Sequence, residues 1–314
     1  MANKRKFNYR QYIVYISFVV VFFGFSILLR DKGFLTPSNL MNILRQTSMI
    51  SVAAVGMCFA ISAGLIDLSI GGVISVTALT VGLLLKTTNV FVAVMAGMGI
   101  GLIFGLINGI IVAKVRLPSF LVTLGTSTVF SGIARIMTNL EAVPITNEGF
   151  NFWFGSGDIG PISMLFIWTL IMMFIGHIVY KKTPFGRAVL SVGGNESAAI
   201  YSGINVDKIK IWALTICSLT ASFAGIMYAA RMHGARYTLG ENDDMSVIEA
   251  VVIGGTSFSG GKGTIIGTII GSIVIGILNN GLLLLGLTVS EQMIARGIVL
   301  ILAVSLSLRE AKER

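Results

Sequence analysis

Apolar segments of membrane-spanning length follow one another along almost the entire chain, and they restrict the folds open to it. They fall near residues 12–29, 44–64, 68–85, 90–113, 119–138, 162–180, 209–230, 245–259, 264–286 and 291–308. A helix needs about 20 apolar residues to cross a bilayer. The sequence therefore predicts an all-α, polytopic membrane bundle of about ten transmembrane helices. The segment 245–259 is short for a full crossing, so a total of eight or nine stays open.

The composition excludes a soluble domain of this length. Hydrophobic residues make up 54% of the chain and charged residues only 12%, whereas soluble domains carry about 25% charged residues. We expect one transmembrane domain over residues 1–314. No small-residue cleavage site follows the first apolar segment, so it is expected to remain as a helix. Cys58 and Cys217 lie in apolar segments and are expected to pack as small hydrophobic side chains.

The basic residues predict the orientation. With both termini in the cytoplasm, most of the 23 lysines and arginines fall on the cytoplasmic side, as is usual for polytopic membrane proteins. We therefore interpret the net charge of +9 as a consequence of the excess of lysine and arginine on the cytoplasmic side. The chain has no basic stripe with interleaved aromatic residues, so we expect membrane lipid, and not nucleic acid, as a partner.

Residues 181–210 form a polar island between two apolar segments. Within NESAAIYSG, Asn195 can cap a short helix, Glu196 lies near its positive end, and Gly203 can close it in a left-handed conformation. A capped helix of mostly small residues is suited to docking into a groove of a partner protein. The other reading of this island is an ordinary cytoplasmic loop.

Glycines recur four residues apart in two apolar segments. Such spacing puts them on one helix face, where a second helix can approach closely in lipid. We expect a packing role for Gly97, Gly101, Gly105 and Gly109, and for Gly263, Gly267 and Gly271. Each series runs on to an Asn-Gly pair, which hints at an internal repeat. Asn108 and Asn280 need polar partners at membrane depth.

Two glycine-rich and serine-rich segments interrupt the helices on the expected cytoplasmic side, at residues 62–72 and 253–264. The second is not a phosphate loop, because Thr256 and Gly263 replace the required glycine and hydroxyl residue. Asp67, Ser69, Asn108 and Asn280 are our candidates for a pathway or a cytoplasmic gate.

Other ionisable residues suggest few special sites. Glu249 and Arg296 lie within apolar segments at similar expected depth, where opposite charges usually find one another. We therefore predict a possible intramembrane pair. The chain has two histidines, His177 and His233, and no cluster of carboxylates or thiols, so we expect no metal site. We also expect no catalytic residue.

Four stretches together resemble the permease subunits of bacterial ribose-type ABC importers. They are GLIDLSIGG at 64–72, VRLPSFLVTLGT at 115–126, GRAVLSVGGNESAAIYSGINVDKIKI at 186–211 and GGTSFSGGKGTIIGTIIGSIVIGILNNGLLLLG at 254–286. The resemblance extends roughly from residue 35 to residue 305. It implies that residues 193–204 form the coupling helix that docks on an ATP-binding subunit. The residues concerned are Gly193, Gly194, Asn195, Glu196, Ala198, Ala199, Ser202, Gly203 and Ile204. Asp67 and Ser69 match the family's turn after the second span.

The resemblance also implies the partners and the location. These are a tandem-cassette ATPase, an extracytoplasmic sugar-binding protein and a second permease copy, with a heterodimer as the alternative. ATP would bind to the ATPase, so this chain would be no enzyme and would hold no cofactor. The protein would be a multi-pass protein of the bacterial cytoplasmic membrane that imports a monosaccharide such as ribose, galactose or xylose.

Residues 230–250 depart most from the family and are expected to face outward, where the binding protein docks. Three alternatives stay open. One is an ABC permease for nucleosides or branched-chain amino acids. The second is a secondary sugar transporter, which would need ion-coupling residues in broken helices at the bilayer midplane. The third is a membrane-embedded enzyme, which would need convergent titratable groups.

Overall fold

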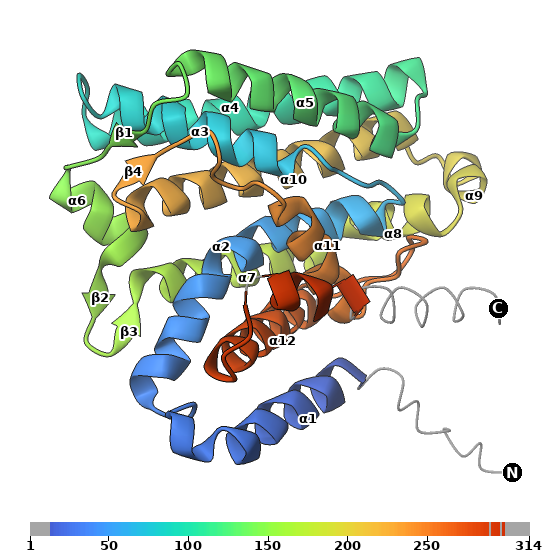
Figure 1. The fold of residues 1–314 in the computed structure, drawn as a ribbon. Coiled ribbons are helices and arrows are strands. Elements are labelled where there is room, and N and C mark those ends of the chain that lie inside the picture. The colour runs from blue at the N-terminus through green and yellow to red at the C-terminus, as the bar shows by residue number, and fades with distance from the viewer. Residues whose placement is uncertain (1–12, 289, 296, 299–314) are drawn as a thin grey trace, which may run out of the picture.

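The computed structural model describes residues 13–288, 290–295 and 297–298. The helices α4, α5 and α10 lie roughly parallel to one another, and α2 runs obliquely to them (Figure 1). The short helix α9 lies at one end of this bundle, and the strands lie at the opposite end together with α6. The predicted polytopic helical class is confirmed.

The helices follow the apolar segments closely. They are α1 (Ile13–Leu28), α2 (Pro37–Ser62), α3 (Ile70–Leu84), α4 (Val90–Ile110), α5 (Ser119–Met137), α6 (Glu148–Asn151), α7 (Met164–Lys182), α8 (Pro184–Gly194), α9 (Glu196–Tyr201), α10 (Val206–Arg231), α11 (Asp243–Ile253) and α12 (Ile265–Leu284). The short helical turns are η2 (Arg30–Lys32), η3 (Ile111–Val115) and η4 (Phe152–Ser156). The strands pair in two antiparallel ladders, β1 (Val143–Pro144) with β4 (Gly234–Ala235), and β2 (Asp158–Ile159) with β3 (Ile162–Ser163).

Six helices of the described residues are long and apolar enough to cross a membrane: α2, α4 with η3, α5, α7, α10 and α12. Two shorter apolar helices, Val14–Leu28 and Ile70–Leu84, accompany them. The eighth predicted segment forms only the 11-residue helix α11. Most of the predicted segment 291–308 lies outside the described residues, so the total of ten stays a prediction.

The helix α2 begins seven residues before its predicted start at residue 44. The Thr36 hydroxyl accepts a hydrogen bond from the backbone amide of Asn39 at 3.3 Å, and Pro37 occupies the first helical position. Both features favour a helix start. Apolar length alone does not reveal this start, because the first two turns of α2 carry the polar residues Ser38, Asn39 and Asn42.

The helices α2 and α10 form the centre of the bundle. Both are mostly buried, and they pack against each other, whereas most residues of α4, α5 and α7 are partly buried or exposed. The exposed side chains on these outer helices are largely apolar, among them Phe91, Ile136 and Phe174. A buried centre with apolar side chains on the outside is the arrangement expected of a bundle surrounded by lipid.

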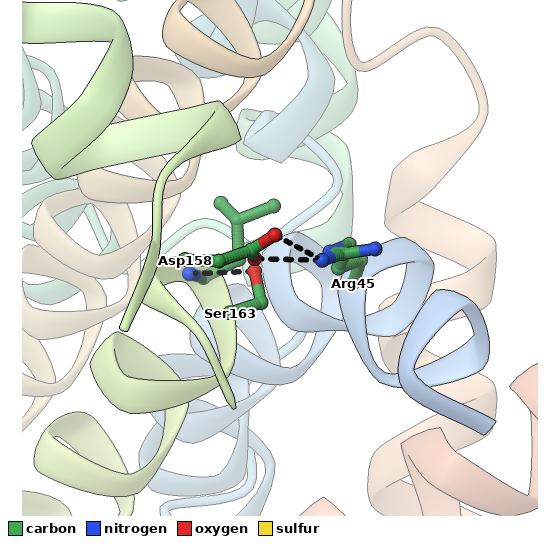
Figure 2. Close-up of polar contacts among 4 residues, drawn as sticks. Arg45, Asp158 and Ser163 are labelled. Atoms are coloured by element: carbon green, nitrogen blue, oxygen red, sulfur yellow. Dashed lines mark hydrogen bonds and ion pairs between the residues drawn. The ribbon is translucent and has the colours of Figure 1, made fainter. Parts of the chain in front are cut away.

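An ion pair fastens the β2–β3 hairpin to α2 at the end of the bundle opposite α9. Figure 2 shows the Arg45 guanidinium facing the Asp158 carboxylate, and Nη2 of Arg45 lies 2.6 Å from both carboxylate oxygens. Asp158 is the register partner of Ser163 in the hairpin. Nη1 of Arg231, at the end of α10, donates to the Arg45 carbonyl oxygen at 3.0 Å. These contacts join α2, α10 and the hairpin.

Candidate functional site

The short helix α9 has the caps that the sequence predicts. The Asn195 side-chain oxygen accepts a hydrogen bond from the Ala198 amide at 2.9 Å. Gly203 then adopts a φ of 79°, a left-handed conformation that suits glycine. Ser202 follows the last turn, and its hydroxyl donates to the Ala198 carbonyl oxygen at 2.9 Å. The caps give α9 fixed ends although it has only 6 residues.

An ion pair holds α9 against the start of α10. The Lys210 ammonium lies 2.8 Å from Oε1 of Glu196 and 2.9 Å from Oε2. The Glu196 carboxylate, which we expected near the positive end of the helix dipole, therefore pairs with Lys210 of the same chain. It fixes the angle between the two helices.

The two faces of α9 differ in burial. Ala199 is buried against Val192 of α8 and Val206 of α10, and Ile204 packs beside them. Ile200 and Tyr201 point outward, and their exposed fractions are 57% and 92%. Neither residue is among the coupling-helix residues expected from the sequence. An Ile-Tyr pair inside an otherwise small and polar segment was the available signal, because an exposed apolar pair on a polar face often marks an interaction site.

The two segments predicted to interrupt the helices, 62–72 and 253–264, both contact residues 193–194, which precede α9. Gly193 lies so close to the Ser62 carbonyl, at the end of α2, that any side chain there would overlap it. Gly260 packs on Gly193, and the Gly261 amide donates to the same Ser62 carbonyl at 3.0 Å. Gly194 lies beside Gly261. We call residues 62–64, 193–194 and 260–261 the glycine junction; it joins the segment before α9 to the end of α2 and to the loop that precedes α12.

Three of the four gate candidates lie together. The Asn108 amide of α4 donates to the Ser69 hydroxyl at 2.8 Å, and this hydroxyl donates to Oδ1 of Asp67 at 2.6 Å. The Ser69 amide also donates to Oδ1 of Asp67 at 2.9 Å. All three side chains are fully buried. They fix the turn between α2 and α3 to α4.

Asn280 lies in a different place. Its side chain exchanges two amide hydrogen bonds with Asn39, at 2.9 and 3.0 Å, and so joins α12 to the first turn of α2. The structure therefore does not bring Asn280 together with Asp67, Ser69 and Asn108.

The glycine series lie at helix contacts. Gly101, Gly105 and Gly109 face α10, and Gly97 faces both α3 and α10. Gly267 and Gly271 of α12 face the last turn of α11. The expectation that Gly263 belongs to the same helix is wrong. It precedes α12 in a loop, beside the hydroxyls of Ser62 and Tyr180, which bond to each other at 2.6 Å. Thr264 caps α12 by accepting from the Gly267 amide, so the helix cannot start earlier.

Two further expectations concern ionisable residues. Glu249 is buried in α11, but Arg296 lies outside the described residues, so their pairing stays a prediction. Within residues 13–288, 290–295 and 297–298, no group of three or more His, Cys, Asp and Glu side chains could hold a metal ion.

The expectation that residues 230–250 face outward as one segment is wrong for their second half. Ala235 contacts Gly82 near the last turn of α3, but Gly240 contacts Gly71 and Ile74 near its first turn. The chain therefore turns back into the bundle along α3, and α11 begins there at Asp243. Charged residues suggested an outer loop, but glycines at 71 and 240 let the two backbones approach closely.

Six helices of membrane-crossing length and a capped helix at one end define a polytopic helical membrane protein, and comparison with known proteins identifies its family. Residues 39–304 match the family described as "Branched-chain amino acid transport system / permease component". The chain belongs to this family.

Several curated relatives resemble the chain over most of its length. Ribose import permease protein RbsC of Bacillus subtilis (strain 168) is 38% identical over 90% of this chain and 88% of its own. Its Escherichia coli (strain K12) counterpart is 40% identical, with 87% of each chain covered. The D-allose transport system permease protein AlsC of Escherichia coli (strain K12) is 32% identical over 97% of this chain and 95% of its own. No solved structure matches the chain.

Proposed function

We propose that the chain is the membrane-spanning permease subunit of an ATP-driven monosaccharide importer. The observation that carries this proposal is the near-full-length similarity to ribose import permeases at 38% and 40% identity. An L-arabinose permease of Azospirillum brasilense is also 35% identical, over 93% of this chain. Six membrane-crossing helices among the described residues agree with a multi-pass protein of the inner membrane.

A branched-chain amino acid is the second candidate substrate, because the family description names it. The relatives cited above favour a sugar, since their names specify ribose, L-arabinose and D-allose.

The proposed assembly contains an ATPase with tandem cassettes, a sugar-binding protein outside the membrane and a second permease, the same chain or a related one. ATP binds to the ATPase, and this chain, with residues 1–314 as one domain, needs no cofactor. Both termini and residues 181–210 face the cytoplasm. The helix α9 docks on the ATPase through Ile200 and Tyr201, whose exposed apolar surface is suited to a hydrophobic groove.

The glycine junction supplies a route for movement from α9 into the bundle. Gly193, in the last turn of α8, contacts the end of α2 and the loop before α12 without intervening side chains. A displacement of α9 that carries the end of α8 with it therefore pushes on both backbones. Packed elements transmit such displacements with little deformation.

Reconstitution tests the proposal. The purified chain alone in liposomes should take up no sugar, with or without an ion gradient. With the ATPase and loaded binding protein, it should take up D-ribose, L-arabinose or D-allose only when ATP is present. Gradient-driven uptake by the chain alone would favour a secondary transporter, and ATP-dependent uptake of leucine alone would favour the second candidate.

A variant pair tests the docking helix. Tyr201→Ala should lower the affinity for the ATPase by about tenfold or more, since buried tyrosines at interfaces often contribute 2 kcal/mol or more. Ser191→Ala, on the exposed surface of α8, is the control and should bind normally. Equal binding of both variants would contradict docking through α9.

A further inference from the structure

A polar cavity of about 190 Å³ lies between α3, α5 and the re-entrant residues 237–244. Its walls include Ser75 of α3, Ser127 and Ser131 of α5, and the polar end of α11 at Asp244. The volume is sufficient for several water molecules. Polar cavities of this kind are unusual in a bundle whose outer surface is mostly apolar, because each polar group at membrane depth needs a partner.

The depth of the cavity follows from contacts along α3. The re-entrant chain contacts Gly82 through Ala235 and Gly71 through Gly240. Eleven residues of helix separate those two glycines, which corresponds to about 16 Å at 1.5 Å per residue. The irregular backbone thus extends deep into the bundle before α11 begins. Irregular backbone at such depth is tolerated where it lines a water-filled space or is covered by protein.

One side of the cavity carries an aromatic ring and charges. The Arg135 guanidinium lies over the Tyr237 ring, 5.0 Å from its centre. Glu241 is exposed and Asp244 is half-buried, and both carboxylates line the same space. The lining of the cavity therefore combines hydroxyls, carboxylates, a guanidinium and an aromatic side chain. These groups supply hydrogen-bond donors and acceptors in several directions.

We infer that this cavity is a transient sugar-binding site within the permease, contacted by the substrate as it crosses the membrane. The inference rests on the proposed function. A monosaccharide is a compact ring with hydroxyls around its edge and C–H groups on its faces. Ser127, Ser131 and Asp244 are placed to bond the hydroxyls, and the Tyr237 ring offers an apolar face. Ser127 and Ser131 of α5 line this cavity with hydroxyls, which suit a polar substrate and not a hydrophobic one.

The cavity lies near the coupling helix but does not include it. Its lining includes Leu68, which lies between Asp67 and Ser69 in the turn fixed by Asn108. The same turn begins at the glycine junction, where Gly64 lies beside Gly193. A movement of α9 can therefore be passed through this turn to Leu68 in the cavity lining. The cavity itself shares none of the residues 193–204.

The first test compares variants of the complete complex in liposomes, with whichever of D-ribose, L-arabinose and D-allose the wild type imports. Ser131→Val removes a hydroxyl from the cavity, and Asp244→Asn removes the charge and replaces one acceptor oxygen with an NH2 donor. Each should lower the sugar imported per ATP hydrolysed by about 3- to 10-fold, the range expected for one lost hydrogen bond. Thr128→Val is the matched control, since Thr128 is exposed on α5 outside the cavity. It should keep the wild-type ratio.

The second test needs no destabilising change. Ser131→Cys is nearly isosteric and should react with a small hydrophilic thiol reagent, whereas the buried Cys58 and Cys217 should not react in the wild type. During turnover with loaded binding protein, the sugar should slow this reaction several-fold. An unreactive cysteine at 131 would show that water does not enter the cavity and would overturn the inference.

The outcomes separate the two proposals. If the wild-type complex imports none of the three sugars, the proposed function fails. If it imports one of them, but Ser131→Val and Asp244→Asn keep the wild-type ratio and sugar does not protect the cysteine at 131, the cavity is not the binding site and only this inference fails.

Discussion

Individual polar side chains in this bundle act mainly by joining helices that are distant in sequence. Asn108 and Ser69 are 39 residues apart, and Asn39 and Asn280 are 241 residues apart, yet each pair is hydrogen-bonded. Within a membrane, water does not compete for these groups, so a buried amide without its partner loses a hydrogen bond outright. Such residues specify which helices pack together.

The buried hydrogen bonds that link Asn108, Ser69 and Asp67 should be needed for stability. Asn108→Ala leaves the Ser69 hydroxyl without its donor, and we expect a loss of about 1–3 kcal/mol in the free energy of unfolding. Thermal unfolding in detergent would measure it. Ile103→Ala on the same helix is the control, since Ile103 is 52% exposed and Asn108 is fully buried. Equal melting temperatures for the two variants would contradict the expected role.

The Glu196–Lys210 pair allows a rescue experiment. Glu196→Lys places two ammonium groups beside each other, so α9 should tilt away from α10 and ATP-dependent import should fall. Exchanging both charges, with Glu196→Lys and Lys210→Glu, should restore import if the pair acts within this chain. A double variant as inactive as the single one would instead show that the Glu196 carboxylate contacts the ATPase.

A second ion pair on the same side of the bundle provides the control for that experiment. Lys114 and Asp207 lie 2.8 Å apart and are both well exposed. Exposed pairs contribute at most about 1 kcal/mol. Asp207→Lys should therefore import sugar at nearly the wild-type rate, which would show that a lost surface pair is not by itself inhibitory.

At the scale of whole helices, the close packing of α4 on α10 depends on missing side chains. Gly101, Gly105 and Gly109 place the α4 backbone directly against Ser218, Thr215 and Ile211 of α10. In lipid, helix association relies on van der Waals contact and not on exclusion of water. The absence of side chains on this face is therefore the source of the contact.

Gly105→Leu should force α4 and α10 apart. Overpacking of a tight contact usually costs about 1–3 kcal/mol, so we expect less folded protein and a lower melting temperature. Gly99→Leu is a matched control on the same helix, because a side chain at Gly99 would meet nothing within 4 Å. Size-exclusion chromatography with thermal challenge would compare them. A stable Gly105→Leu protein with altered sugar preference would indicate a pathway role for this face.

The whole molecule has two chemically different ends. One carries α9 and the glycine junction, and the other carries the two strand pairs and the Arg45–Asp158 contact (Figures 1 and 2). The basic residues of the sequence predict that the first end faces the cytoplasm. The structure brings together the polar island 181–210 and the two interruptions at 62–72 and 253–264, since Gly64, Gly193 and Gly260 are neighbours.

Single cysteines at exposed positions would test this orientation. Thr88→Cys and Thr146→Cys should react with an impermeant thiol reagent added outside intact cells. Ser197→Cys and Ser259→Cys should react only after the membrane is permeabilised. All four positions are exposed in the structure. A position that does not react is therefore shielded by the membrane and not by the protein. Outside labelling at residue 197 would reverse the orientation.

The sequence by itself determined the helical membrane class, the approximate positions of most helices and the caps of α9. These are local properties, since twenty consecutive apolar residues, or an asparagine followed by a short helix and a glycine, act within their own segment. The polar starts of helices, as at Thr36, were within reach of the same reasoning.

Only the tertiary structure decided which segments meet. A glycine permits close approach but does not name its partner, so neither the junction of Gly193 with Ser62 nor the packing of Gly240 on α3 could be predicted from spacing. The cavity beside Ser131 likewise exists because residues 237–244 turn back along α3, and that path depends on contacts between backbones more than 150 residues apart. Long-range packing, and not local propensity, fixes these parts of the protein.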